Sequence, residues 1–376
     1  MASCRTLSVR RLLEEEHLIR HQLALGRAGL GSLARVWAGI ARLVAHPPRP
    51  AAARYETGSH ANVTRERQML TDKRFRIAAV ALLACLTARD IRGQEIVVTL
   101  LGTGSPIPEV ERFGPSILVQ AGSQTLVFDV GRGAHQRLVQ TGLTAGQVDA
   151  IFLTHLHSDH IIGIPDLWLT GWQSRQNRPW AVFGPSGTVR MMDALKLAFS
   201  ADIQARVEET GGLLSPVGAE VSARDIEPGV VYEREGLRVT AIRVDHGAIA
   251  PAYGYRVDFS GRSVVLSGDT QVSPALIEAA TGTQLIIHEV FQASDALLRD
   301  NPAMARIKKL HVDASEAGSI FQRVRPSLAV YSHIVLRGVS IDELVKRTRA
   351  SYNGPLVVGE DLMRFIVGEN VTIYRR

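Results

Sequence analysis

The seven-residue stretch 154–160, Thr-His-Leu-His-Ser-Asp-His, constrains this chain more than any other. It contains three histidines and one carboxylate, and it directly follows an apolar run that predicts a buried strand. His155 and His157 are two positions apart, so they project to the same side of an extended segment. Asp159 and His160 follow where the chain turns, so they can face a second point nearby. The stretch therefore predicts a metal site at the end of a strand, with enough donors for two adjacent cations.

The composition limits which ligands such a site can use. The chain has 376 residues, of which 45% are hydrophobic and 21% charged, as in a globular protein with a sizeable core. Its two cysteines are Cys4 and Cys85. Beyond residue 85 there can be neither a disulfide framework nor a thiolate site, so a cation there must bind imidazole and carboxylate groups.

The positive charge is concentrated at the N-terminus. The net charge is +6, but residues 1–94 carry 16 Lys+Arg against 7 Asp+Glu, whereas residues 95–376 carry 27 against 30. The part that contains the histidine stretch is therefore slightly acidic. This balance disfavours a broad nucleic-acid-binding face, although it leaves a local basic patch open.

Residues 1–68 do not have the pattern of a folded core. They are rich in Arg and Ala and include a Pro-rich stretch at 45–53. We predict a disordered leader or translation from an upstream start codon. A transit peptide is a further alternative, but the acidic run at 14–16 argues against it.

Residues 69–94 have the layout of a secretory signal peptide. A short basic segment beginning at Met69 precedes an apolar run at 77–88, and polar residues follow. Twelve apolar residues are too few to span a bilayer. We therefore expect export to the periplasm or the extracellular space, with Met69 as the start and a lipid anchor at Cys85 as an option. The alternative is a buried helix in a cytoplasmic protein.

Four more polar groups follow apolar strand patterns in the second half of the chain. We predict strands at 237–244, 263–266, 285–287 and 328–331. The motifs that follow them are, in order, Asp245-His246-Gly247, Ser267-Gly268-Asp269-Thr270, His288-Glu289 and Ser332-His333. Packing alone does not explain why His or Asp recurs at the ends of five strands. We expect these ends to converge on the histidine stretch.

These residues suffice for two cations with about four ligands each. We assign His155, His157, His246 and Asp269 to the first, and Asp159, His160, His333 and Asp269 to the second. Asp269 is the expected bridge because a carboxylate has two oxygens. The donor set suits two Zn²⁺ ions, with manganese or iron as alternatives. Such a pair, roughly 3.5–4 Å apart, binds a bridging hydroxide and serves hydrolysis. Asp129, at another strand end, is a candidate to hold a ligand histidine.

Several segments are less specific. A helix predicted at 166–176 places Trp168 and Trp172 on one face, either packed under the sheet or forming an apolar wall near the metals. A helix is expected at 188–201 and another at 313–324, the latter capped by Asp313. Residues 205–235 have no assignable pattern. We expect a last strand pair formed by 355–358 and 371–374. We interpret His135 as a surface histidine.

Taken together, the motifs from Ile96 to Tyr374 resemble the metallo-β-lactamase fold, and within it the ribonuclease Z and arylsulfatase-like branch. The matching segments are Leu-Gly-Thr-Gly-Ser at 101–105, Phe-Asp-Val-Gly at 128–131, His-Leu-His-Ser-Asp-His at 155–160, Asp-His-Gly at 245–247, Gly-Tyr-Arg-Val at 254–257, Ser-Gly-Asp-Thr at 267–270, His-Glu at 288–289 and Ser-His at 332–333. The resemblance implies an α/β protein, a four-layer αβ/βα sandwich built from two mixed β-sheets. It implies one hydrolase domain at 95–376 with the dinuclear zinc site at its edge.

The resemblance also implies catalytic roles. His311 matches the histidine that protonates the leaving oxygen in that branch, and Glu289 supports it. Asp159 would orient the metal-bound hydroxide. From chemistry alone, His311 could equally be a surface residue at the start of a helix.

One departure from the branch bears on the substrate. Members that process transfer RNA carry a long arm between the Gly-Tyr and Gly-Asp-Thr segments, but here only 258–266 separates them. We therefore expect a zinc-dependent hydrolase of a small-molecule ester, either a sulfate ester, a phosphodiester or a lactone. The alternatives are a ribonuclease Z-like endonuclease that processes transfer-RNA 3′ ends, and an inactive metal-binding scaffold. A homodimer is an open option.

Overall fold

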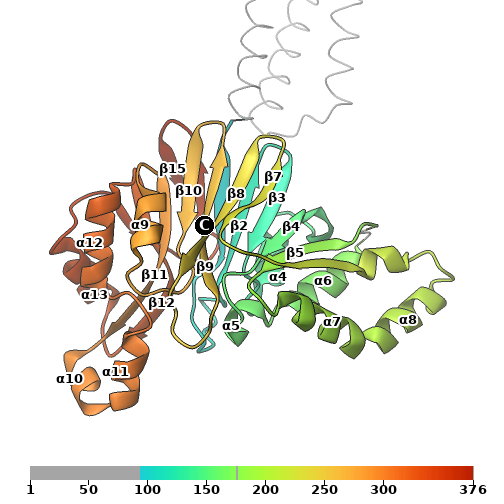
Figure 1. Ribbon diagram of the computed structural model, residues 1–376, viewed down its shortest axis with the longest axis horizontal. Coiled ribbons are helices and arrows are strands. Elements are labelled where there is room, and N and C mark those ends of the chain that lie inside the picture. Colours follow the sequence, from blue (N-terminus) through green and yellow to red (C-terminus); the bar gives the residue numbers. More distant parts are fainter. Residues whose placement is uncertain (1–93, 175–176, 376) are drawn as a thin grey trace, which may run out of the picture. The chain divides into compact units, whose positions relative to one another are not determined.

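The computed structural model describes residues 94–174 and 177–375, all within one compact unit (Figure 1). The predicted leader at 1–68, the predicted signal peptide except for its last residue, and the proposed anchor Cys85 lie outside the described residues. No described helix combines the length and apolar character that crossing a membrane requires.

The first sheet has eight strands in the order β15-β14-β1-β2-β3-β4-β5-β6. The pairs β3-β4, β4-β5 and β5-β6 are parallel, whereas the pairs from β15 to β3 are antiparallel. The strands are β1 (Ile96–Gly102), β2 (Ser116–Ala121), β3 (Gln124–Phe128), β4 (Ala150–Phe152), β5 (Trp180–Gly184), β6 (Val221–Asp225), β14 (Arg364–Val367) and β15 (Val371–Tyr374).

The second sheet has seven strands in the order β13-β12-β11-β10-β9-β8-β7. It is also mixed, because β10 to β13 pair in parallel and β7 to β10 pair antiparallel. The strands are β7 (Gly229–Arg234), β8 (Leu237–Val244), β9 (Ala252–Phe259), β10 (Arg262–Leu266), β11 (Leu285–Ala293), β12 (Leu328–Arg337) and β13 (Leu356–Val358).

Helices cover the outer face of each sheet (Figure 1). The first sheet carries α4 (Ala134–Gln140), α5 (Ser158–Ile161), α6 (Ile164–Gln173), α7 (Thr188–Ala198) and α8 (Ser200–Glu209), with 3₁₀ turns η1 (Ala145–Gln147) and η2 (Pro216–Ala219). The second carries α9 (Pro274–Ala280), α10 (Asp295–Asp300), α11 (Pro302–Lys308), α12 (Ala314–Val324) and α13 (Ile341–Arg349). The predicted four-layer αβ/βα sandwich of two mixed sheets is confirmed.

The alternation of side chains along the strands explains why both sheets are covered on both faces. In β3, Leu126 and Phe128 pack between the two sheets, whereas Val127 packs under the helices of the first sheet. In β10, Val264 lies between the sheets and Val265 faces the helices of the second sheet. Strands that are buried on both faces read as continuous apolar runs, which is the pattern seen in the sequence.

Local signals predicted some elements well and others poorly. The helix expected at 313–324 is α12, and Asp313 forms the predicted cap with Glu316 three residues later. One expectation was wrong. The segments 355–358 and 371–374 do not pair, because β13 belongs to the second sheet and β15 pairs with β14, which the sequence analysis missed. The unassigned segment 205–235 contains part of α8 together with η2, β6 and β7.

The three tryptophans among the described residues belong to the core of the protein. Trp168 and Trp172 lie on α6, Trp180 begins β5, and all three are buried under the first sheet. The indole N–H of Trp168 donates to the carbonyl of Ala219, which ties α6 to η2. The packing interpretation is therefore confirmed, and the alternative of a tryptophan wall near the metals was wrong. His135 is not a surface histidine either, since its side chain is only 12% exposed and pairs with Asp166.

Candidate metal centre

The seven predicted ligands lie together at one edge of the sandwich, although they come from both sheets. The first sheet supplies His155 and His157, which follow β4, and also Asp159 and His160 at the start of α5. The second sheet supplies three more from separate strands; they are His246 after β8, Asp269 after β10 and His333 within β12. Neither sheet alone could assemble this cluster.

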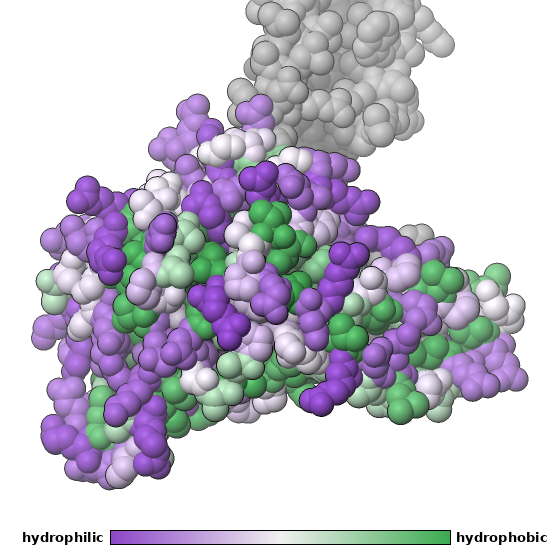
Figure 2. Space-filling view, in the orientation of Figure 1, coloured by the Kyte–Doolittle hydropathy of each residue, from purple (hydrophilic) through white to green (hydrophobic). Residues whose placement is uncertain are grey.

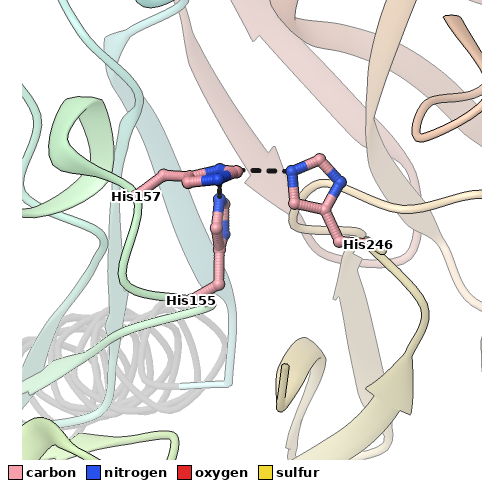
Figure 3. Close-up of side chains that lie close together, drawn as sticks. All are labelled: His155, His157 and His246. Atoms are coloured by element: carbon pink, nitrogen blue, oxygen red, sulfur yellow. Dashed lines mark hydrogen bonds between the residues drawn. The ribbon is translucent and has the colours of Figure 1, made fainter. Parts of the chain in front are cut away.

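Three imidazole rings form the first ligand group (Figure 3). Nε2 of His155 lies 2.9 Å from Nδ1 of His157, and Nε2 of His246 lies 3.3 Å from the same atom. The ring planes of His155 and His157 are inclined by 80°, so their nitrogens face a common point from different directions. The group brings together three of the four residues assigned to the first cation.

Asp159, His160 and His333 form the second group. Nε2 of His333 and Nε2 of His160 lie 3.3 and 3.6 Å from Oδ2 of Asp159. All three residues are buried. His333 has a backbone φ of 45°, a left-handed conformation that is rare for a residue other than glycine and is often found at functional sites.

Oδ2 of Asp269 lies between the two groups. It is 4.0 Å from Nε2 of His155 and 3.8 Å from Nε2 of His246 in the first group. It is 3.5 Å from Nε2 of His160 and 3.2 Å from Nε2 of His333 in the second. One carboxylate oxygen therefore approaches both groups, which is the geometry that a bridging ligand requires.

Asp129 and Thr154 orient two of the ligand rings. Oδ2 of Asp129 is 2.8 Å from Nδ1 of His160, and the backbone N–H and the hydroxyl of Thr154 both donate to the Asp129 carboxylate at 2.8 Å. The Thr154 hydroxyl oxygen lies 3.0 Å from Nδ1 of His155. Each ring thus has a hydrogen-bond partner at Nδ1, which leaves Nε2 for a cation.

His246 is held in the same way by a different part of the fold. Its Nδ1 lies 3.0 Å from the carbonyl oxygen of Leu310, just after α11. That carbonyl accepts the Nδ1 proton, so the lone pair of Nε2 faces the cluster. The residue that orients His246 is 64 positions away in the sequence.

The charges of the cluster fit cations. Burial lowers the pKa of His155, His157 and His246, which favours the neutral imidazole that a metal requires. Burial alone would raise the pKa of Asp159 and of Asp269, but nearby imidazoles, His333 foremost, outweigh it and lower both. Both carboxylates therefore remain ionised at neutral pH.

The surroundings of His160 favour a positive charge. Burial opposes its protonation, yet the Asp269 and Asp129 carboxylates outweigh burial and raise its pKa well above the usual range. Nε2 of His160 and Oδ1 of Asp269 are buried and have no hydrogen-bond partner among the described residues. A cation at this point would bind these atoms and take the place of the proton, so the residues present fit a metal.

His311 and Glu289 form a pair beside the cluster. Nδ1 of His311 lies 3.2 Å from Oε2 of Glu289, and the ring of His311 lies 4.9 Å from that of His246. The side chain of His311 is only 10% exposed, so the alternative of a surface residue was wrong. Burial opposes the charged ring, but Glu289 outweighs it and raises the pKa of His311 to about 9. His311 is therefore mostly protonated at neutral pH.

His288 does not join the cluster, although it also followed an apolar strand pattern. Strand β11 continues through it to Ala293, and its Nδ1 bonds to the carbonyl of Glu289. It belongs to none of the ligand groups that the described residues form. Its role is within the core.

A cavity of about 400 Å³ opens onto the cluster. Besides the ligands and His311, it is lined by Pro106, Phe291, Met304, Ile307, Leu310, Val335 and Arg337. None of these seven residues was predicted from the sequence to belong to the site. The spacing of Met304, Ile307 and Leu310, each three apart, is the signal that could have indicated an apolar face there.

The chain matches the family model of the β-lactamase superfamily domain over residues 117–334. It belongs to the metallo-β-lactamase superfamily. It is 37% identical to a ribonuclease Z from Mycobacterium marinum over 277 residues, which cover 72% of this chain and 98% of the relative. A ribonuclease Z from Mycolicibacterium gilvum is 35% identical over 284 residues, 73% of this chain and 98% of the relative. The predicted placement in the ribonuclease Z branch is thus confirmed, and the protein is a hydrolase of that superfamily.

Solved structures support the same fold. The metallo-β-lactamase fold protein YhfI from Bacillus subtilis superposes with a TM-score of 0.58 at 17% identity, covering 73% of this chain and 99% of the other. The short form of human tRNase Z gives a TM-score of 0.52 at 22% identity, covering 71% and 98%. At these identities the likeness concerns the fold alone.

Proposed function

We propose that this hydrolase cleaves phosphodiester bonds in RNA in the manner of ribonuclease Z, the alternative to the small-ester substrate that the sequence favoured. The curated relatives named above are ribonucleases Z, and the chain spans nearly all of their length. We further propose two zinc ions as cofactors, with manganese or iron as alternatives. The seven ligands would be the six residues of the two groups together with Asp269.

The observation that carries the proposal is the position of the His311–Glu289 pair. A ligand nitrogen of His311 lies within 4.8 Å of donor atoms of His246 and Asp269. A ribose hydroxyl is a poor leaving group, so its departure requires a general acid next to the attacked phosphorus. His311, with a pKa of about 9, holds the required proton at neutral pH.

Bound divalent cations would supply Lewis acidity and lower the pKa of a water molecule. Asp159 orients the attacking water and helps to take its proton, because its ionised carboxylate reaches the cluster from the start of α5. His311 donates its proton to the leaving oxygen. Glu289 keeps His311 charged and in position, since its other oxygen is fixed by the backbone N–H of Val312 at 3.0 Å.

A second candidate is hydrolysis of a small sulfate ester, phosphodiester or lactone. The observation in its favour is the connection between β9 and β10, which is a tight hairpin at Ser260 and Gly261 and leaves no room for a protruding arm. Export and a lipid anchor stay predictions, because the segments concerned lie outside the described residues.

A substrate panel separates the two candidates. The purified full-length chain, with its metal content measured by mass spectrometry, is incubated with a precursor transfer RNA carrying a 3′ extension, p-nitrophenyl sulfate, bis(p-nitrophenyl) phosphate and an aromatic lactone. We expect removal of the 3′ extension, loss of that activity in His246→Ala and its retention in the control His135→Ala. Hydrolysis of the sulfate or lactone without RNA cleavage would contradict the proposal and favour the second candidate.

A further inference from the structure

The short helix α11 presents apolar side chains that the core does not bury. Met304, Ile307 and Leu310 are three positions apart, so they follow one face of the helix and of the turn after it. All three line the cavity that opens onto the metal centre. No residue of α11 is fully buried, and Ile307 is 42% exposed. We call these three residues the apolar wall.

The apolar wall is fixed relative to the ligands. The side chain of Asn301 caps α11 by accepting from the backbone N–H groups of Ala303 and Met304. Nζ of Lys308, at the other end of α11, lies 3.0 Å from Oδ2 of Asp313 and 3.2 Å from Oε2 of Glu316 on α12.

The wall is also joined to the metal centre itself. The carbonyl of Leu310 holds Nδ1 of His246, as described above. Met304 packs on a small apolar cluster that includes Phe291 and Val335. A ligand that contacts the wall is therefore held at a set position relative to the cluster.

The charges around the cavity restrict what can occupy it. Arg337 lines the cavity, and its guanidinium donates to the carbonyl of Leu336 at 3.1 Å. Among the described residues that line the cavity, the acidic ones are Asp159 and Asp269, which belong to the ligand groups. The cavity thus joins a cation-binding end, an arginine and an apolar wall. A molecule that fits carries an anionic group and an apolar part close together.

We propose that the apolar wall binds the nucleobase of the nucleotide whose phosphate lies at the metal centre. This inference rests on the proposed function, because it takes the anionic group to be a phosphodiester of RNA. The aliphatic side chains of the wall offer a surface but no hydrogen-bonding pattern, so the contact excludes water from the base without selecting its identity. The wall then selects nucleotides over phosphate esters that lack a base.

Calorimetric binding of two small ligands tests this inference separately from RNA cleavage. Adenosine 5′-monophosphate and ribose 5-phosphate both carry a phosphate on a ribose, but only the first has a base. We expect the zinc-loaded full-length chain to bind the nucleotide about tenfold more tightly, the change that about 1.4 kcal/mol of apolar burial produces. In Ile307→Asp that preference falls below about threefold, and in Ile307→Ala it falls by a smaller amount.

The control is an apolar side chain that is exposed elsewhere. Figure 2 shows hydrophobic residues on the side of the molecule that carries α7 and α8, where Leu197 is 76% exposed. Leu197→Asp should retain the tenfold preference. Equal affinity of the wild-type chain for the two ligands, or the same preference in Ile307→Asp as in Leu197→Asp, overturns the inference. So does binding of p-nitrophenyl phosphate without binding of the nucleotide, which would indicate an aryl ester as the occupant.

The two proposals can fail independently. If the chain does not cleave RNA but prefers the nucleotide through Ile307, the proposed function is wrong and the wall still binds a base. If the chain cleaves RNA but shows no preference, the inference about the wall is wrong and the proposed function stands.

Discussion

Oδ2 of Asp129 lies 2.8 Å from Nδ1 of His160, and this contact links a strand end of the first sheet to the centre of the cluster. Asp129 has a backbone φ of 56°, so the turn that follows β3 is built around it. We predict that Asp129→Asn, which tolerates this conformation, weakens metal binding about 10- to 100-fold, since it removes the charge that orients the ring. Competition with a chromophoric chelator measures the affinity.

The matched control for that experiment is Asp149→Asn. The carboxylate of Asp149 also accepts a hydrogen bond from a backbone N–H group, that of Thr125, at 2.8 Å. Asp149 is not part of the metal centre. Equal metal affinity in the two variants would show that Asp129 does not orient a ligand.

Asp269 is the residue that the two ligand groups share. We predict that Asp269→Ala lowers the bound metal and reduces activity more than about a hundredfold, because the loss of one group that stabilises the transition state already costs about 10²- to 10³-fold. Metal content and initial rates are measured on the same preparation. Asp258→Ala is the control, because Asp258 lies at the end of β9 and pairs with Arg256. Full activity and full metal content in Asp269→Ala would exclude this centre.

The pH dependence of the reaction should report on His311. Its pKa is raised to about 9, so the protonated form that donates to the leaving group prevails below that pH and is lost as the pH rises through about 9. We predict an alkaline limb of kcat near pH 9 in the wild type. In Glu289→Gln the carboxylate that holds the proton is gone, so the limb moves toward the ordinary histidine range near 6.5.

His311→Gln provides the complementary measurement. It should remove the alkaline limb and lower kcat about 10²- to 10⁴-fold, the usual contribution of a general acid, with metal content unchanged. An unchanged limb in both variants would mean that another group donates the proton.

A buried carboxylate anchors the loop before β2. The carboxylate of Asp361, which is 3% exposed, accepts from the backbone N–H groups of Thr103 and Phe113 and from Nε of Arg137. Asp361→Ala should lower the free energy of unfolding by about 3 kcal/mol, because it leaves the partly buried guanidinium of Arg137 and two backbone N–H groups without this partner. Urea unfolding measures this.

The same substitution should also affect the site, since Pro106 in that loop lines the cavity. We expect KM to rise while the metal content stays constant. Arg349→Ala is the control, as Arg349 also bonds to backbone, at Gly354, but far along the chain from that loop. A stability equal to that of the wild type would contradict the role of Asp361 as an anchor.

Much of the sheet framework could be predicted because its signals are local. Continuous apolar runs identified β1, β3 and β10, and the cap at Asp313 located α12. The failures have physical causes. The segment 205–235 is only partly buried and therefore lacks an apolar pattern. The hairpin of β14 and β15 is local, but its two strands are short and β15 is mostly exposed, so it has no continuous apolar run. The pairing of β14 with β1 joins residues more than 260 positions apart, and no local signal indicates it.

The sequence by itself determined the chemistry of the centre. The spacing of His155, His157, Asp159 and His160, with His or Asp at later strand ends, was enough to predict a metal-binding cluster and a hydrolase, because ligand type and strand position are local properties. Only the tertiary structure decided how the cluster is completed. It brought Oδ2 of Asp269 between the two groups and placed the carbonyl of Leu310 on His246. These contacts join residues whose separation along the chain carries no periodic signal, so they exist only once the two sheets have packed together.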